Sequence, residues 1–230
     1  MRDPVPPQEA NSTPSSGRMS RGKLVVIAAG VVFLGGFMVK NDLSEDSGPP
    51  PQPAAVATQP AAPAPAAVDP ADALVMRSSP PVRIKIDRID VNAPFVGLTL
   101  GSSGVLNVPP PTDRNLAGWY KDGVTPGARG NALVLGHVDT MTGPAVFWGL
   151  GSLKPGDVVE VTRADASVAK FAVDSVESFP KDDFPDDRVY GKTQDAQLRL
   201  ITCGGTYDKK SKDYKDNVVV FAHLIAAQKP

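Results

Sequence analysis

Cysteine and histidine are both scarce in this chain. Its 230 residues include one cysteine, Cys203, and two histidines, His137 and His223. A single cysteine excludes an intramolecular disulfide and any site that needs two thiolates. The chain also lacks an excess of charge of one sign, since 24 basic residues stand against 25 acidic ones without a basic stripe, which excludes nucleic acid as a partner. It contains neither a glycine-rich phosphate loop nor a Gly-x-Ser-x-Gly elbow.

Long apolar runs are also rare, and the clearest is residues 24–39. This uncharged run follows basic residues and precedes acidic ones, so the positive-inside rule puts the N-terminus in the cytoplasm and the rest of the chain outside. We expect a cytoplasmic tail over 1–22 and a single-pass transmembrane signal anchor over 23–40. A cleaved secretory signal is the alternative, but no small-x-small cleavage site directly follows Val39.

Proline is concentrated near the N-terminal third of the chain. Residues 48–70 consist almost wholly of proline, alanine and small polar residues, which bury too little apolar surface to offset the entropy of ordering. We therefore predict a disordered Pro/Ala-rich linker over 41–76. The remaining residues, 77–230, number about 150, which suits one extracellular domain with a single core.

Short runs rich in Val, Ile, Leu and Phe fill this domain, and clusters of Gly, Pro, Asp or Asn separate them. Such runs predict β-strands, and about eight at this spacing indicate an all-β fold, as a closed barrel or a sandwich. Residues 145–153 are the best candidate for a short helix, ended by the turn at 154–157. The predicted strands are residues 82–86, 95–100, 105–109, 131–137, 157–163, 168–178, 197–203 and 217–225.

Cys203 and His137 both stand where predicted strands end. Cys203 is followed by two glycines, which leaves its side chain beside an open backbone, although a buried cysteine acting as a small hydrophobe is the alternative. His137 lies at a strand-to-loop junction, whereas His223 lies inside an apolar run and reads as structural. A thiolate with an imidazole partner is the requirement for nucleophilic cysteine catalysis.

A third group could stabilise an oxyanion. Arg199 is four residues from Cys203 on one predicted strand and so shares its face. No arginine follows Cys203 in the sequence, and the lysines of the stretch 206–217 read as a solvated loop. The two histidines and the aspartates of 180–187 lack the usual ligand spacing, so no metal site is expected, with a loose calcium site as the alternative.

Four motifs of the domain resemble, in order and spacing, the sortases, and specifically the class F sortases of actinobacteria. These motifs are LVLGHVDT at 133–140, LKPGDVVEV at 153–161, LRLITCGG at 198–205 and YKDNVVVFA at 214–222. The resemblance spans residues 80–226, and anchor, linker and domain follow the same layout as in that family. It implies an eight-stranded β-barrel with short helices.

The resemblance also implies a reaction. Cys203 would attack a carbonyl within a short LPxTG-like sorting signal of an exported protein, forming a thioacyl enzyme, and an amine of a cell-wall peptide or lipid-linked precursor would resolve it. His137 would serve as proton donor and acceptor, and the resemblance implies that no cofactor is required. Sortases usually carry an arginine on the strand after the cysteine, where this chain has only lysines, so Arg199 is the preferred substitute and Lys215 the alternative.

Two other readings stay open. A non-catalytic, membrane-tethered β-domain that binds exported proteins or wall peptide would have a shielded Cys203. An unrelated cysteine transpeptidase acting on the wall itself would carry a Ser-x-Gly-Cys type signature, which this sequence lacks.

Overall fold

The computed structural model describes residues 48–53 and 74–229. The predicted transmembrane segment at 24–39 and most of the predicted linker lie outside these residues. Within the described ranges, no helix has both the length and the apolar character needed to cross a membrane.

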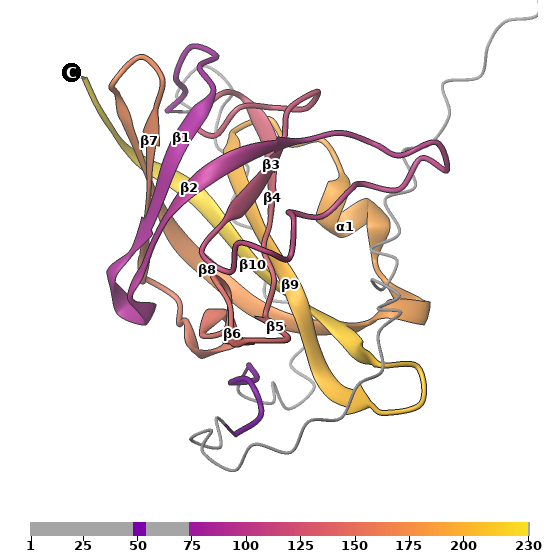
Figure 1. Ribbon diagram of the computed structural model, residues 1–230. Coiled ribbons are helices and arrows are strands. Elements are labelled where there is room, and N and C mark those ends of the chain that lie inside the picture. Colours follow the sequence, from indigo (N-terminus) through magenta and orange to yellow (C-terminus); the bar gives the residue numbers. More distant parts are fainter. Residues whose placement is uncertain (1–47, 54–73, 230) are drawn as a thin grey trace, which may run out of the picture.

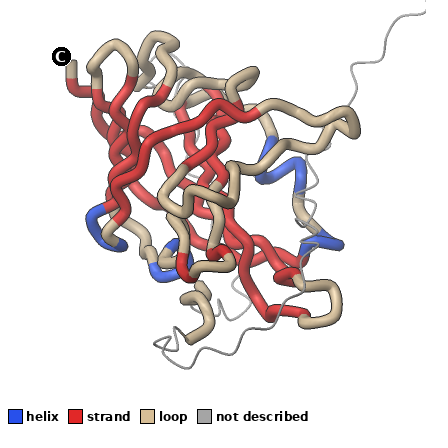
Figure 2. The backbone as a smooth tube through the Cα atoms, in the orientation of Figure 1, coloured by secondary structure: helices blue, strands red, loops and turns tan. Residues whose placement is uncertain are grey.

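The described domain is a closed β-barrel, as Figures 1 and 2 show. Around the barrel the strands follow the order β1-β2-β3-β4-β9-β10-β8-β7, and all neighbours are antiparallel except the pairs β2 with β3 and β4 with β9. A separate two-stranded ribbon, β5 (Asp139–Thr140) with β6 (Gly143–Pro144), follows β4. The barrel strands are β1 (Pro81–Ile86), β2 (Val91–Leu98), β3 (Ala117–Tyr120), β4 (Gly130–Leu135), β7 (Val158–Arg163), β8 (Val168–Pro180), β9 (Ala196–Asp208) and β10 (Asp213–Gln228).

The predicted all-β, eight-stranded barrel is confirmed, but one of its strands was assigned wrongly. Residues 105–109 form no strand and contribute only an isolated bridge between Leu100 and Leu106. The missing strand is β3, which pairs in parallel with β2. Its four residues, AGWY, are too short a run to show alternation, and a parallel neighbour is not visible in local sequence.

The helical prediction also needs correction. Residues 145–153 contain only a 3-10 turn, η2 (Leu150–Ser152), because glycines at 149 and 151 weaken a longer helix. Two other 3-10 turns are η1 (Asp87–Ile89) and η3 (Lys181–Asp183). The α-helix of the described residues is α1 (Asp186–Tyr190), which begins at the end of the acidic stretch 180–187.

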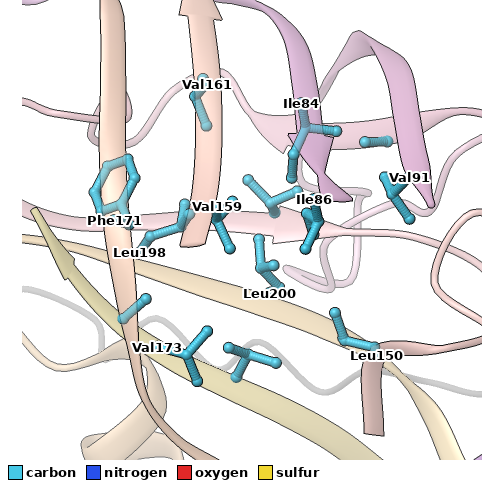
Figure 3. Packing of buried hydrophobic residues seen from close by; sticks show 14 of the residues in the cluster. Ile84, Ile86, Val91, Leu150, Val159, Val161, Phe171, Val173, Leu198 and Leu200 are labelled. Atoms are coloured by element: carbon cyan, nitrogen blue, oxygen red, sulfur yellow. The ribbon is translucent and has the colours of Figure 1, made fainter. Parts of the chain in front are cut away.

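Two apolar clusters stabilise the barrel. The larger fills the barrel interior, where Ile84, Phe171, Leu198 and Leu200 are fully buried (Figure 3). The smaller cluster, here called the outer cluster, combines side chains of β4, β9 and β10 with side chains of the 98–108 connection and α1. Its buried members are Leu98, Leu106, Leu135, Val189, Ile201, Val219 and Phe221.

The alternation of β9 assigns its side chains to these two clusters. Leu198 and Leu200 point into the barrel, whereas Ile201 belongs to the outer cluster. Since alternate residues of a strand share a face, Arg199 and Cys203 also lie on the outer side. The thiol is therefore on the outside of the barrel wall, at the far end of β9 from Arg199.

Candidate active site

His137 and Cys203 follow two neighbouring strands at the same level. The parallel strands β4 and β9 stay in register up to Leu135, which pairs with Ile201, and the next N–H, that of Gly136, donates to the Ile201 carbonyl at 3.1 Å. His137 and Cys203 each come two residues after this pair. Because alternate residues of a strand share a face, Cys203 belongs to the outer side of β9 with Ile201, and His137 lies just past the end of β4. The fold thus brings the backbone of His137 and that of Cys203 to neighbouring positions at the end of β4 and on β9.

Three hydrogen bonds fix the position of His137. Its Nε2 lies 2.7 Å from the Pro109 carbonyl, its own carbonyl accepts from the Phe147 N–H at 3.0 Å, and the preceding Gly136 carbonyl accepts from the Thr202 hydroxyl at 2.8 Å. A carbonyl only accepts, so Nε2 carries a proton. Nδ1 is then the ring nitrogen that can gain or lose a proton during a reaction.

A lysine lies beside the thiol. Lys181 Nζ is 3.7 Å from Cys203 Sγ and forms an ion pair with Asp213 at 2.7 Å. Cys203 is partly exposed as a residue, but its sulfur is sufficiently surrounded that burial raises the pKa of the thiol. Lys181 opposes this rise in pKa, and the carboxylates of Asp213 and Asp139 add to it.

A second polar contact joins the loop after His137 to the strand after Cys203. The Tyr214 hydroxyl donates to Asp139 Oδ2 at 2.5 Å, so β10 is linked to β5 directly beside the site. Burial and this carboxylate both raise the pKa of Tyr214, which keeps the phenol protonated as the donor. The contact fixes the carboxylate of Asp139 two residues beyond His137.

Arg199 does not bring its charge to the thiol. Its guanidinium stacks on the Phe221 ring at 4.5 Å and donates to Gln197 Oε1 at 2.7 Å, toward the start of β9 and away from Cys203. The two residues are separated by about 13 Å along the strand. Burial lowers the pKa of Arg199 to about 10. These contacts favour a structural role in the outer cluster over the predicted role at the oxyanion.

Lys215 also stands apart from the thiol. The pairing of β10 with β9 shifts between Tyr214 and Asp216, and Lys215 occupies this irregularity with an exposed side chain. The residue directly opposite Cys203 on β10 is Asn217, which is only 2% exposed. Cross-strand partners share a face, so Asn217 flanks the thiol on the side opposite to His137.

A sequence profile described as "Sortase domain" matches residues 84–225, which include both His137 and Cys203. The chain belongs to the sortase family. Sortases are cysteine transpeptidases, so the family assignment agrees with a cysteine nucleophile on this barrel.

Several solved sortases are similar to this chain at low identity. Sortase A of Listeria monocytogenes is 19% identical, over 66% of this chain and 92% of that one, with a TM-score of 0.49. Sortase A of Corynebacterium diphtheriae is 20% identical, over 65% and 62%, with a TM-score of 0.48. Sortase E1 of Streptomyces coelicolor is 19% identical, over 65% and 90%, with a TM-score of 0.47. No curated protein matches the sequence. The family assignment depends on the profile match, not on these similarities.

Sequence reasoning missed two neighbours of the thiol in this sortase. Lys181 lies 22 residues before Cys203, on the turn that follows β8, and no local pattern connects the two. Counting residues back along both strands from the hairpin at 209–212 predicts which part of β10 lies opposite Cys203. The shift in pairing between Tyr214 and Asp216 makes this count wrong by one residue, so it points to the neighbour of Asn217.

Residues 48–53, here called the proline segment, pack beside the nucleophile. The Gly205 N–H donates to Gln52 Oε1 at 2.8 Å, and Pro50 is buried. On the other side of the segment, a Cβ on Gly151 would lie 2.1 Å from the Pro51 carbonyl oxygen. Part of the stretch predicted as a disordered linker therefore has a defined place on the domain, below β5 and β6 in Figure 1.

The remaining candidates lie away from the thiol. His223 Nδ1 is 2.6 Å from Asp174 Oδ1 on β8, and its side chain is 43% exposed. Among the residues described, no group of three or more His, Cys, Asp or Glu side chains could hold a metal ion. A surface hollow formed by 88–91, 114–115 and 144–152 includes neither Cys203 nor His137.

Proposed function

We propose that this sortase is a class F transpeptidase in which Cys203 is the nucleophile and His137 its proton donor and acceptor. The observation that supports this most strongly is that His137 and Cys203 each come two residues after the paired Leu135 and Ile201, at neighbouring positions of the barrel wall. Cys203 lies on the outer side of the wall and is partly exposed, whereas the barrel interior is filled with apolar side chains (Figure 3).

The proposed reaction has two acyl transfers. The thiolate of Cys203 attacks a peptide carbonyl carbon and forms a C–S bond, and the cationic His137 then donates a proton to the leaving amine as the C–N bond breaks. An incoming amine next attacks the thioester, gives a proton to the neutral His137 and forms a new C–N bond while the C–S bond breaks. The thiolate and the imidazolium are thereby restored.

The proposed substrates are exported proteins with a C-terminal, LPxTG-like sorting signal. The acceptor is an amine of a cell-wall peptide or of a lipid-linked precursor in a Gram-positive cell. Sortases in general act on such proteins and precursors, and the motifs of residues 133–140 and 198–205 support the class F assignment. The apolar run at 24–39 supports a single-pass membrane anchor with the domain outside the cell.

The test is a cleavage assay with the full-length protein in detergent and a fluorogenic Leu-Pro-x-Thr-Gly peptide, with and without an amine acceptor. The wild type should cleave the peptide and show a thioacyl adduct by intact mass, and Cys203→Ala should show neither. Absence of the adduct in a folded wild type whose Cys203 also resists alkylation would instead support the non-catalytic binding domain.

A further inference from the structure

We propose that Lys181, held in place by Asp213, supplies a positive charge at the Cys203 nucleophile, whose following strand β10 contains no arginine. This inference rests on the proposed function, and it assigns a cationic role to a residue from the connection between β8 and β9. The contact of Lys181 Nζ with Cys203 Sγ, at 3.7 Å, is the observation that carries it.

The position of Lys181 follows from the barrel. β8 and β10 run side by side (Figure 1), and their pairing ends where Pro180 lies opposite Asp216. Lys181 is the next residue, so it leaves the barrel wall one strand away from β9. Its side chain is 16% exposed, and Nζ contacts both carboxylate oxygens of Asp213 at 2.7 and 2.8 Å. Two short contacts from a fixed partner hold the ammonium at the sulfur.

The other candidate cations are farther away or more exposed. Arg199 is committed to Phe221 and Gln197, and Lys215 is exposed at the irregularity of β10. Within the described residues, Lys181 is the cationic side chain hydrogen bonded to the thiol sulfur. The titratable groups that act on Cys203 come from three neighbouring elements: Lys181 from η3, Asp213 and Tyr214 from β10, and Asp139 from β5. His137 follows the end of β4, next to β9.

A lysine suits this role because its ammonium is a compact point charge that can approach a single sulfur atom. It stabilises the thiolate before the attack, when the thiol proton has moved to His137, and again when the C–S bond breaks and the negative charge returns to sulfur. Asp213 fixes the position of Nζ, and its negative charge opposes part of the lowering effect of Lys181 on the pKa of the thiol. Burial still raises the pKa of Cys203 above its ordinary value, so the benefit of Lys181 is a larger thiolate fraction at a given pH.

The test measures the pH dependence of Cys203 alkylation by iodoacetamide in the full-length protein, without peptide. Lys181→Met should raise the thiol pKa by about one unit, and alkylation at neutral pH should become about tenfold slower, because the thiolate fraction below the pKa changes tenfold per unit. Lys181→Arg should restore most of the rate. Asp213→Asn should make alkylation faster, since it removes a carboxylate that raises the thiol pKa and keeps an oxygen that accepts from Nζ.

The matched control is Lys209→Met, which removes the same charge from an exposed position in the hairpin loop after β9. Its alkylation profile should equal that of the wild type, and thermal melting monitored by circular dichroism should show that all variants are folded. An unchanged profile in a folded Lys181→Met variant, or equal slowing in Lys209→Met, would overturn the assignment.

Peptide cleavage then separates this inference from the proposed function. With Leu-Pro-x-Thr-Gly peptide, Lys181→Met should lower kcat at neutral pH about tenfold, with little change in KM, and raising the pH should recover part of the loss. If the wild type cleaves no peptide while Lys181→Met still shifts the alkylation profile, the proposed function fails and the placement of the charge at the thiol stands. If cleavage occurs and Lys181→Met has the wild-type alkylation profile, the role of Lys181 fails alone.

Discussion

Gly136, which precedes His137, has no room for a side chain, and Gly136→Ala should therefore displace the proposed proton donor. A Cβ there would lie 2.4 Å from Phe147 Cδ2 and 2.7 Å from Val146 Cγ1, closer than real Cβ contacts come. Phe147 is fully buried, so it cannot move into solvent to make space. Overpacking of this kind costs about 1–3 kcal/mol of the free energy of unfolding.

The strain should also reach the imidazole. Gly136 is hydrogen bonded to β9 through both its N–H and its carbonyl, and the His137 carbonyl accepts a hydrogen bond from the N–H of Phe147. If Phe147 or Gly136 shifts to relieve the clash, the backbone of His137 therefore moves as well. A displacement of about 1 Å in a reacting group lowers the rate by about 100-fold. We expect kcat for peptide cleavage to fall by about that factor. Urea titration followed by Trp fluorescence measures the accompanying loss in the free energy of unfolding.

Gly97→Ala is the control for this substitution. Its Cβ would meet only the flexible side chain of Lys121, at 3.4 Å or more, so stability and kcat should stay near the wild-type values. A folded Gly136→Ala variant with wild-type kcat would refute the reasoning, because it would show either that the contact with Phe147 relaxes without moving His137 or that the position of His137 does not limit catalysis.

Three further predictions concern the barrel core, the thiol and the proline segment. Phe171→Ala should lower the free energy of unfolding in urea by about 3–5 kcal/mol, since the ring is fully buried inside the barrel; a loss below about 1 kcal/mol would contradict this packing. Because burial raises the pKa of the Cys203 thiol, the folded state keeps this proton to a higher pH than the unfolded chain, so stability should fall as pH rises above the thiol's ordinary pKa. Urea titrations at several pH values should show this decrease in the wild type and a smaller one in Cys203→Ala. Gly151→Ala should push the Pro51 carbonyl away and speed hydrogen exchange of the Gly205 amide, whereas unchanged exchange would show that the segment tolerates the extra methyl group.

Most of the barrel strands could be predicted from local patterns, because burial on one face imposes alternation along the chain. The runs at 82–86, 131–137, 168–178 and 217–225 became β1, β4, β8 and β10, with shifts at their ends. β3 could not be found in this way, since its pairing with β2 is parallel and depends on how the connection between them folds back. The 105–109 run was misassigned because apolar residues that cover the outside of a barrel look like those of a strand.

The sequence by itself determined the chemistry of the candidate site. One cysteine and two histidines left few combinations, and the positions of Cys203 and His137 at strand ends distinguished them from His223. Only the tertiary structure decided which charge faces the sulfur. Arg199 shares the strand and the face of Cys203 but turns toward Phe221, whereas Lys181 comes from the turn that follows β8 and reaches the thiol. Residue spacing fixes which face of a strand a side chain takes, but closure of the barrel fixes which distant side chains meet across neighbouring strands.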